Sequence, residues 1–194
     1  MENVIKDIKT FVPINTSLEF CLDTNVLYWY TYPRYTCEAN RGIQLHAQPY
    51  YDFVDTLVSN GNPLITTRYN ISELINIIEK HEFEIFCAKN TDAKYTIKDW
   101  RRMPQQRKAL KKILKTTIEN AKAICSVLDF NFSESILDAC VNSLDCHRCD
   151  VFDYAIISFY QRTNHLNIIT DDDDFTSIEG LRLFTANERS LSRN

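Results

Sequence analysis

The sequence predicts an α/β fold, a three-layer α/β/α sandwich in which helices cover both faces of a mostly parallel, five-stranded sheet. Two observations favour it. Short apolar runs alternate along the chain with longer stretches whose apolar residues recur at helical spacing. Only 3 of the 194 residues are glycines, which argues against a fold built from tight β-hairpins. The chain shows no repeat and no linker, and we therefore expect a single domain that spans residues 1–194.

Five short apolar runs are the expected strands. They occupy residues 18–22, 64–66, 126–128, 166–169 and 181–184. When these strands are numbered in chain order, their expected order across the sheet is 3-2-1-4-5. The first and fourth strands are then neighbours at the point where the strand order reverses, which is where ligands bind in sheets of this kind.

Helix signals fill the intervals between the strands. A helix should begin near Thr24 and end before Pro33, because proline cannot continue a helix. Residues 34–48 are polar and irregular, and the next helix is expected over residues 49–59. Asn70 is the expected N-cap of a third helix, in which apolar residues recur at helical spacing. Further helices are expected over residues 104–124, from Ser133 towards Cys140, and over residues 151–161.

Residues 81–124 are predicted to be a basic helical elaboration of this domain. Residues 80–115 hold 11 of the 22 lysines and arginines but only four acidic residues, so this segment carries +7 and the rest of the chain −11. A basic arm beside an acidic pocket suits a polyanionic substrate, and the alternative is an ordinary solvated helix face. The candidate nucleic-acid contacts are Arg101, Arg102, Lys108, Lys111, Lys112 and Lys115.

Acidic residues stand at four places that this topology brings together. Asp23 ends the first strand, and Asp171–Asp174 follow the fourth. Glu73 lies early in the helix after the second strand, and Asp153 lies in the first turn of the helix that leads into the fourth. Carboxylates gathered in one cleft repel one another, and a divalent cation between them relieves the repulsion. Metal-dependent chemistry is therefore the first functional hypothesis.

Each acidic residue taken alone has a simpler explanation. Asp23 could cap the helix that begins at Thr24, and Asn70 with Glu73 resembles a capping box. Asp153 could favour a helix N-terminus through the helix dipole, and the aspartate run could be a solvated turn. None of these explanations accounts for the joint placement, and the joint placement favours a metal site.

Four segments resemble the motifs of PIN-domain nucleases, a family that includes the ribonuclease toxins of bacterial toxin–antitoxin pairs. The segments follow one another in the family's order and cover nearly the whole chain apart from its middle. They are Leu22-Asp23-Thr24-Asn25-Val26-Leu27, Asn70-Ile71-Ser72-Glu73-Leu74, Asp153-Tyr154-Ala155-Ile156-Ile157 and Ile169-Thr170-Asp171-Asp172-Asp173-Asp174-Phe175.

The resemblance implies Mg²⁺- or Mn²⁺-dependent hydrolysis of phosphodiester bonds. Asp23, Glu73, Asp153 and Asp172 would be the catalytic, metal-binding positions. The implied polar groups beside them, or in contact with substrate, are Thr24, Asn25, Asn70 and Thr170. The sequence departs from the family in two ways, and these leave undecided which residues bind the metal. The basic insert lengthens the interval from Glu73 to Asp153, and the aspartate run offers Asp174 as an alternative to Asp172. Asp150 is a rival or helper to Asp153, since residues three apart share a helix face.

The resemblance further implies an endoribonuclease that acts on single-stranded RNA, and the toxin of a toxin–antitoxin pair. Its partners would be RNA, an antitoxin protein and a second copy of the chain. The alternatives are a structure-specific DNA nuclease and a non-catalytic nucleic-acid- or partner-binding module. A phosphoacceptor receiver domain is a weaker alternative, because Asp129 ends the third strand as required but no lysine follows the fifth.

The composition bounds the cellular setting. No stretch approaches the roughly 20 apolar residues of a membrane span, and the first seven residues carry charges where a signal peptide needs an apolar run. We therefore expect a cytoplasmic protein with no membrane partner, whose seven cysteines are mostly free. Cys146 and Cys149 lack the further ligands of a zinc site. Tyr32 and Tyr35 are the aromatic residues best placed to be exposed and to stack on bases.

Overall fold

The computed structural model describes residues 3–34 and 41–193, and it has the predicted α/β architecture. Six strands form one sheet in the order β1-β6-β5-β2-β3-β4, and every pair of neighbours runs parallel. The strands are β1 (Val4–Asp7), β2 (Phe20–Leu22), β3 (Leu64–Thr67), β4 (Ser126–Leu128), β5 (Asn167–Ile169) and β6 (Arg182–Thr185).

The sheet differs from the prediction by one strand. The five predicted strands keep the expected relative order, but β1 adds a sixth at the edge beside β6, with Val4 opposite Arg182. Only Ile5 of this strand is buried, and the strand also contains Lys6 and Asp7. Short, charged strands are typical of sheet edges, where one side faces solvent. The prediction of five strands is therefore wrong, because β1 lacks the apolar run that marks the others.

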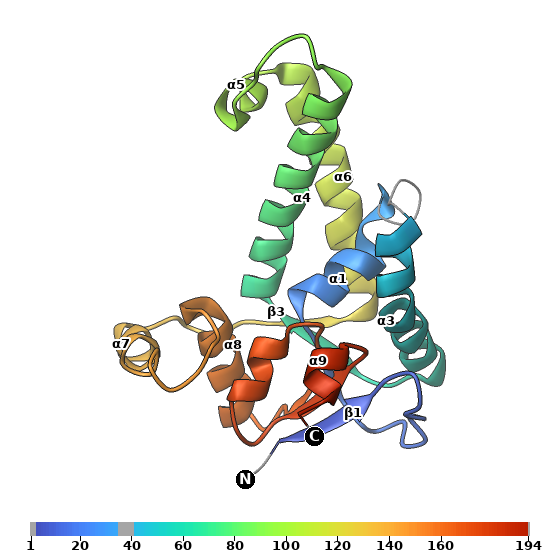
Figure 1. Cartoon of the computed structure of the whole chain (residues 1–194), viewed down its shortest axis with the longest axis vertical. Coiled ribbons are helices and arrows are strands. Elements are labelled where there is room, and N and C mark those ends of the chain that lie inside the picture. The colour runs from blue at the N-terminus through green and yellow to red at the C-terminus, as the bar shows by residue number, and fades with distance from the viewer. Residues whose placement is uncertain (1–2, 35–40, 194) are drawn as a thin grey trace.

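Two hydrophobic clusters lie on opposite faces of the sheet. Side chains alternate along a strand, so Phe20 and Leu22 of β2 belong to one cluster and Cys21 to the other. The first cluster includes residues of α1 (Thr24–Thr31), α3 (Arg41–Asn60), α4 (Arg68–Lys89) and α6 (Pro104–Ile124). The second includes residues of α8 (Val151–Arg162). Helices thus pack on both faces, an arrangement compatible with three layers (Figure 1).

Helix α3 corrects the prediction that residues 34–48 are irregular. The helix begins at Arg41 and runs through Pro49, which was expected to start it. A proline inside a helix removes one backbone hydrogen bond and crowds the preceding turn. Here the neighbouring Ala47, Tyr50 and Phe53 are buried in the first cluster, and that packing offsets the cost.

Helix α4 begins three residues earlier than predicted. Its N-cap is Thr67, whose side chain accepts from the Asn70 backbone N–H while the Asn70 side chain accepts from the Thr67 backbone N–H. The capping box is therefore Thr67 with Asn70, and the predicted roles of Asn70 as N-cap and of Glu73 as the end of a box are both wrong. Glu73 lies in the second turn and is free of any capping role.

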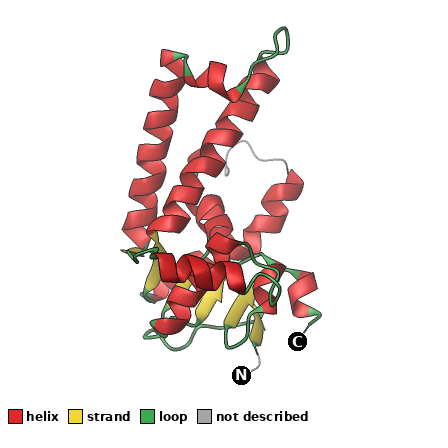
Figure 2. Cartoon of the chain, turned by 90° about the vertical axis from the view of Figure 1, so that its left-hand side faces the viewer, coloured by secondary structure: helices red, strands yellow, loops and turns green. Residues whose placement is uncertain are grey.

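The predicted basic elaboration is a helical hairpin. Helices α4 and α6 lie side by side, and α5 (Ile97–Arg101) joins them at the end farthest from the sheet (Figures 1 and 2). Helix α6 has the predicted bounds. Trp100 of α5 is 1% exposed and meets Phe83 edge-on, with ring centroids 6.0 Å apart. Glu79 accepts hydrogen bonds from both Arg101 and Arg107, so these ion pairs tie the three helices together.

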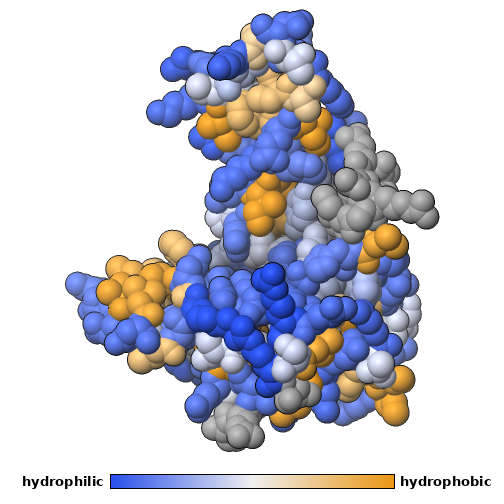
Figure 3. Space-filling model, viewed as in Figure 1, coloured by the Kyte–Doolittle hydropathy of each residue, from blue (hydrophilic) through white to orange (hydrophobic). Residues whose placement is uncertain are grey.

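The remaining elements are α7 (Glu134–Asn142), the 3₁₀ helix η1 (Asp173–Ser177) and α9 (Glu188–Leu191). Helix α7 projects from the rest of the molecule and carries an apolar surface patch (Figures 1 and 3). No helix in the described part of the chain combines the length and the apolarity that a membrane span requires. The six cysteines within that part are free thiols, and Cys37 lies outside it.

Candidate functional site

Asp23 lies at the carboxyl edge of the sheet, where β2 and β5 are neighbours. Its backbone N–H donates to the Ile169 carbonyl at 3.1 Å, and its side chain caps α1. One carboxylate oxygen accepts from the Thr24 backbone N–H at 2.7 Å, and the other accepts from the Thr170 hydroxyl at 2.6 Å. The predicted cap and the predicted site are thus the same residue, and two of its predicted polar neighbours hold it in place.

Burial makes ionisation of Asp23 costly. The side chain is 8% exposed, and its burial is the main reason that its pKa is raised to about 7. The charges of Glu73 and Asp172 raise the pKa further, whereas the hydrogen bonds from Thr170 and Thr24 lower it. Asp23 therefore lies close enough to both carboxylates to be affected by their charge, although neither is near it in the sequence.

Asp153 is the most strongly perturbed carboxyl group of the site. It lies in the first turn of α8, behind Asp150, which caps that helix by accepting from the backbone N–H groups of Phe152 and Asp153. Burial raises the Asp153 pKa to about 8, and the charges of Asp23, Asp150, Glu73 and Asp172 add to the effect. The structure thus brings these predicted carboxylates into one region.

Hydrogen bonds across the helices position Glu73. The buried Thr24 hydroxyl donates to Glu73 Oε2 at 2.7 Å and accepts from Asn70 Nδ2 at 3.1 Å. Glu73 itself is exposed. Asn25 lies slightly apart, since its side-chain oxygen accepts from the Asp171 backbone N–H at 3.5 Å. Three of the four predicted polar groups therefore contact the carboxylates or their direct partners, and Asn25 contacts the aspartate run instead.

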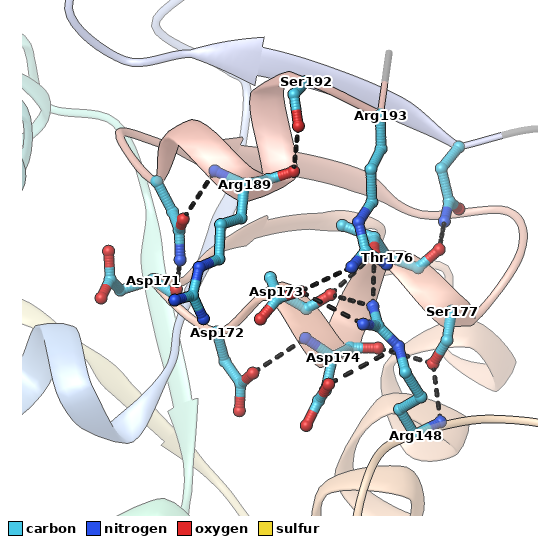
Figure 4. Close-up of polar contacts among 12 residues, drawn as sticks. Arg148, Asp171, Asp172, Asp173, Asp174, Thr176, Ser177, Arg189, Ser192 and Arg193 are labelled. Carbon is cyan, nitrogen blue, oxygen red and sulfur yellow. Dashed lines mark hydrogen bonds and ion pairs between the residues drawn. The ribbon is translucent and has the colours of Figure 1, made fainter.

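The four consecutive aspartates have different environments (Figure 4). Asp171 accepts from the Tyr50 hydroxyl at 2.6 Å and meets His46 Nε2 at 2.8 Å. Asp173 forms ion pairs with Arg148 at 3.2 Å and with Arg193 at 3.0 Å. These two carboxylates form hydrogen bonds or ion pairs with residues that are distant in the sequence. Asp171 and Asp173 therefore have structural partners that the sequence did not reveal.

The environments of Asp172 and Asp174 separate the two candidates for the fourth ligand. Asp174 lies 3.6 Å from Arg148 Nε, and 42% of its side chain is exposed. Asp172 caps η1 by accepting from the Asp174 backbone N–H at 2.8 Å, and its own N–H donates to the Thr170 hydroxyl. Burial raises the pKa of Asp172, and its charge raises the pKa of Asp23 and of Asp153. Asp172 is therefore the member of the run that belongs with the other carboxylates.

No lysine, arginine or histidine within the described residues forms an ion pair with Asp23, Glu73, Asp153 or Asp172. Within the part of the chain that the structure describes, no cationic side chain is therefore paired directly with these four acids. Buried charges are normally paired or bound to metal, so such a group is suited to a cation supplied from outside.

The oxygen atoms are not gathered tightly around one point. In the described part of the chain, the acidic group whose ligand atoms all lie within 4.8 Å of one another is Asp172–Asp174. No three of Asp23, Glu73, Asp153 and Asp172 meet that distance. Mg²⁺ is commonly bound through one or two carboxylates together with several waters, so a looser set of oxygen ligands fits such an ion. The donors are hard oxygen atoms, as Mg²⁺ and Mn²⁺ prefer.

A pocket of about 240 Å³ opens beside the carboxylates, between α4 and α8. Glu73, Asp150 and Asp153 line it, whereas Asp23 and Asp172 are not among its lining residues. Ile156 also lines it, and the rest of its lining comes from residues that the sequence did not single out as site residues. These include Tyr69, Ser72 and Asn76 of α4 and Phe152 of α8. The spacing of Tyr69, Ser72 and Asn76, which places them on the Glu73 face of one helix, is the signal that could have found them.

Only part of the predicted basic surface leads towards this pocket. Lys111 and Lys115 line a hollow of about 630 Å³ together with Arg107 and Lys122. Lys122 also lines a second hollow, of about 660 Å³, whose walls include Ser72. Ser72 in turn lines the pocket beside the carboxylates. Neighbouring hollows therefore share lining residues, and we refer to the three hollows together as the hairpin groove.

The other predicted nucleic-acid contacts lie outside this groove. Lys108 and Lys112 directly follow Arg107 and Lys111 in α6. Both are exposed, and neither lines any of the three hollows. Arg101 is paired with Glu79, and Arg102 lies 3.7 Å from Asp99. The expectation that Tyr32 is exposed is wrong, because Tyr32 is 1% exposed and donates to Glu82 at 2.5 Å. Tyr35 lies outside the described residues.

The arrangement combines carboxylates that form no ion pair within the described residues, buried hydroxyls that orient them, and a nearby surface with exposed basic residues. Such a site can bind a divalent cation and bring a polyanion against it. No protein-family model matches the sequence, and no curated protein matches it.

Proposed function

We propose that the protein is a metal-dependent nuclease that hydrolyses phosphodiester bonds of single-stranded RNA. The observation that carries this proposal is the placement of the carboxylates: Glu73 and Asp153 line one pocket, and Thr24 forms hydrogen bonds with both Glu73 and Asp23. Burial and the charges of Asp23, Asp150, Glu73 and Asp172 raise the pKa of Asp153 to about 8. Near neutral pH such a group holds protons or binds a cation, and a divalent ion would allow every member to be ionised.

The protein's own residues prepare the site for such an ion. Thr170 and the Thr24 backbone hold the two oxygens of Asp23, and the Thr24 hydroxyl holds Glu73. Asp153 and Asp172 approach from α8 and from the loop after β5. When bound, Mg²⁺ or Mn²⁺ would supply Lewis acidity for attack on a phosphodiester. No histidine base is required in this scheme, since the carboxylates can orient the attacking water.

The hairpin groove supports a nucleic-acid substrate. Arg107, Lys111, Lys115 and Lys122 are all exposed along it. Arg107 is paired with Glu79 and Lys115 lies 3.8 Å from Glu119, whereas Lys111 and Lys122 form no ion pair within the described residues. Lysine and arginine side chains at this spacing can follow the phosphates of an extended strand. Glu73 and Asp153 line one of the three hollows, and we propose that a strand bound along the basic residues brings a phosphodiester to them.

The resemblance to PIN-domain nucleases supports the preference for RNA, the two candidate ions, and the role of a toxin whose partner is an antitoxin protein. The free thiols of the described cysteines suit the cytoplasm, which we propose as the compartment.

The test is incubation of the purified chain with labelled single-stranded RNA, single-stranded DNA and branched DNA, each with Mn²⁺ or with EDTA. We expect cleavage of the RNA with Mn²⁺ alone, and no cleavage by Asp23→Asn. Asp138→Asn is the matched control, because Asp138 is an exposed aspartate on α7. Preference for branched DNA would identify a structure-specific DNA nuclease instead. Binding without cleavage of any substrate would identify a non-catalytic module.

A further inference from the structure

The pocket between α4 and α8 has features that a metal site does not need. At about 240 Å³ it is smaller than the roughly 300–1,000 Å³ that is usual for drug-sized ligands. Three carboxylates line it, those of Glu73, Asp150 and Asp153. The other lining residues are aromatic, neutral and polar, or apolar: Tyr69, Phe152, Ser72, Asn76 and Ile156. The pocket is therefore large enough for a ligand of a few atoms or one flat ring, placed directly beside the carboxylates.

Phe152 supplies an exposed aromatic surface in this pocket. Its side chain is 58% exposed although it lies in the first turn of α8, directly before Asp153. Phe132 stacks against it, with ring centroids 5.8 Å apart and planes 20° apart. Tyr69, which also lines the pocket, packs against Phe132 with centroids 5.8 Å apart. The Phe152 ring is thus supported on one side and open on the other.

Polar groups in the pocket are free to bind a ligand. Ser72 and Asn76 lie four residues apart on the pocket face of α4, and both are exposed. Within the described residues, neither side chain forms a hydrogen bond with another group of the protein. An amide next to an aromatic ring can read the edge of a base while the ring stacks on its face.

We propose that this pocket binds one unpaired nucleobase, stacked on Phe152, beside the phosphodiester that is cleaved. The inference rests on the proposed function and deepens it, because a base reaches the pocket only when it is outside a duplex. Base–aromatic stacking is common in proteins that bind single strands, and it tolerates different bases. The pocket would thus select unpaired substrate at the catalytic site, while the hairpin groove holds the adjoining phosphates.

The other explanation of the exposed ring is a protein interface. Leu137, Val141 and Leu144, in and just after α7, are 41–51% exposed, and they form part of the apolar patch in Figure 3. None of the three lines the pocket, which is concave and carries carboxylates and an amide. A base satisfies these polar groups, whereas an apolar protein surface would leave them without partners.

The test measures binding apart from cleavage. A single-stranded RNA oligonucleotide carrying one 2-aminopurine is titrated with wild-type protein in Ca²⁺, and its fluorescence is followed. We expect quenching by wild type and by Phe152→Tyr, and affinity about 5- to 150-fold weaker for Phe152→Ala. An oligonucleotide with an abasic site at the same position should bind wild type as weakly as the intact one binds Phe152→Ala. Leu137→Ala is the matched control and should behave as wild type.

Cleavage in Mn²⁺ is measured on the same proteins, which separates the two proposals. If wild type cleaves RNA but Phe152→Ala binds and cleaves as wild type does, the base pocket is wrong and the nuclease stands. If quenching depends on Phe152 but no variant cleaves, the base pocket stands and the nuclease is wrong. If Phe152→Ala changes only the molecular mass measured by light scattering, the ring belongs to a protein interface and the inference is overturned.

Discussion

The hydroxyl of Thr24 donates a hydrogen bond of 2.7 Å to Oε2 of Glu73, from the first turn of α1 to the second turn of α4. Thr24 is 3% exposed, whereas Glu73 is exposed. The same hydroxyl accepts from Asn70 Nδ2, and the side-chain oxygen Oδ1 of Asn70 accepts from the Thr67 backbone N–H and from the Thr67 hydroxyl. The capping residue Thr67 is therefore linked to the Glu73 carboxylate by hydrogen bonds through the side chains of Asn70 and Thr24, and these bonds orient that carboxylate.

Replacing Thr24 with valine tests this connection. Valine keeps the shape of the side chain but leaves the Asn70 amide without its acceptor in a buried position. We expect the free energy of unfolding to fall by about 1–3 kcal/mol and cleavage to slow by about 10- to 100-fold. Thr24→Ser retains the hydroxyl and should keep most of the stability and most of the cleavage rate. Urea unfolding and single-turnover cleavage give the two numbers, and a valine variant that cleaves faster than the serine variant would contradict the assignment.

The raised carboxyl pKa values predict how the stability of the metal-free protein depends on pH. In the folded state the pKa of Asp23 is raised to about 7 and that of Asp153 to about 8, while an unfolded aspartate titrates near 3.9. The folded protein thus holds more protons than the unfolded chain between about pH 4 and pH 8. Stability from these groups is fully present below about pH 4 and is lost as the pH rises to about 8. We expect the free energy of unfolding of the metal-free protein to decrease by several kcal/mol over that range.

Chemical denaturation in EDTA at a series of pH values measures this decrease. Asp153→Asn is the informative variant, because its amide cannot ionise and its stability should fall less between about pH 5 and pH 8. Mn²⁺ binds the ionised site and should stabilise wild type more at about pH 8 than at pH 5. Equal pH profiles for wild type and Asp153→Asn would show that Asp153 is not perturbed in solution.

Local sequence signals predicted much of the fold. The apolar runs located five strands, and the bounds of α6 follow from Pro104 and the apolar stripe behind it. The errors occurred where tertiary packing overrides a local rule. Pro49 favours a helix start by that rule, but burial of Ala47 and Tyr50 extends α3 through it. Ile5 contributes one buried residue to an edge strand, which is too little apolar sequence to reveal β1.

The carboxylates of the site were predictable from the ends of strands and the starts of helices. Asp23 and Asp172 follow apolar runs, so topology alone placed them together. The arginines that occupy Asp173 come from 25 and 20 residues away, and no spacing rule connects them. The residues around Phe152 in the sequence do not distinguish it from an apolar helical residue that is buried in the core. Its exposure depends on where α7 and α8 leave the surface open, which is a property of the folded chain.

The different environments of the aspartate run give a sharp comparison of charge-removing variants. Asp172→Asn should slow Mn²⁺-dependent cleavage by about 100-fold or more, because it removes a carboxylate that acts on both Asp23 and Asp153. Asp174→Asn should cleave within a few-fold of wild type, since Asp174 is half exposed beside Arg148. Cleavage rates at saturating Mn²⁺ decide between them. The reverse ranking would assign the fourth ligand to Asp174.

Asp173→Asn should act on stability and not on the metal. It removes the ion pairs with Arg148 and Arg193, which connect the loop after β5 to the segment before α8 and to the C-terminal end. The expected decrease is about 0.5–2 kcal/mol of unfolding free energy, with an unchanged affinity for Mn²⁺. Thermal denaturation and Mn²⁺ titration measure these two effects. A large fall in Mn²⁺ affinity would instead assign Asp173 to the metal site.

The lysines of α6 provide a matched test of the hairpin groove, because two of them line it and two do not. Lys111→Ala with Lys115→Ala removes two positive charges from the groove, and Lys108→Ala with Lys112→Ala removes two from the neighbouring exposed face. Both double variants have the same net charge and composition, and both are changed in the same helix.

We expect only the Lys111 and Lys115 double variant to weaken binding of single-stranded RNA. It should also reduce the slope of log K against log salt by about 0.7 for each phosphate that the protein no longer neutralises. Filter binding in Ca²⁺ between about 50 and 200 mM salt, the range over which phosphate contacts strongly affect affinity, supplies the slopes. Equal slopes for the two double variants would mean that RNA responds to the overall charge of the hairpin and that the groove does not direct it.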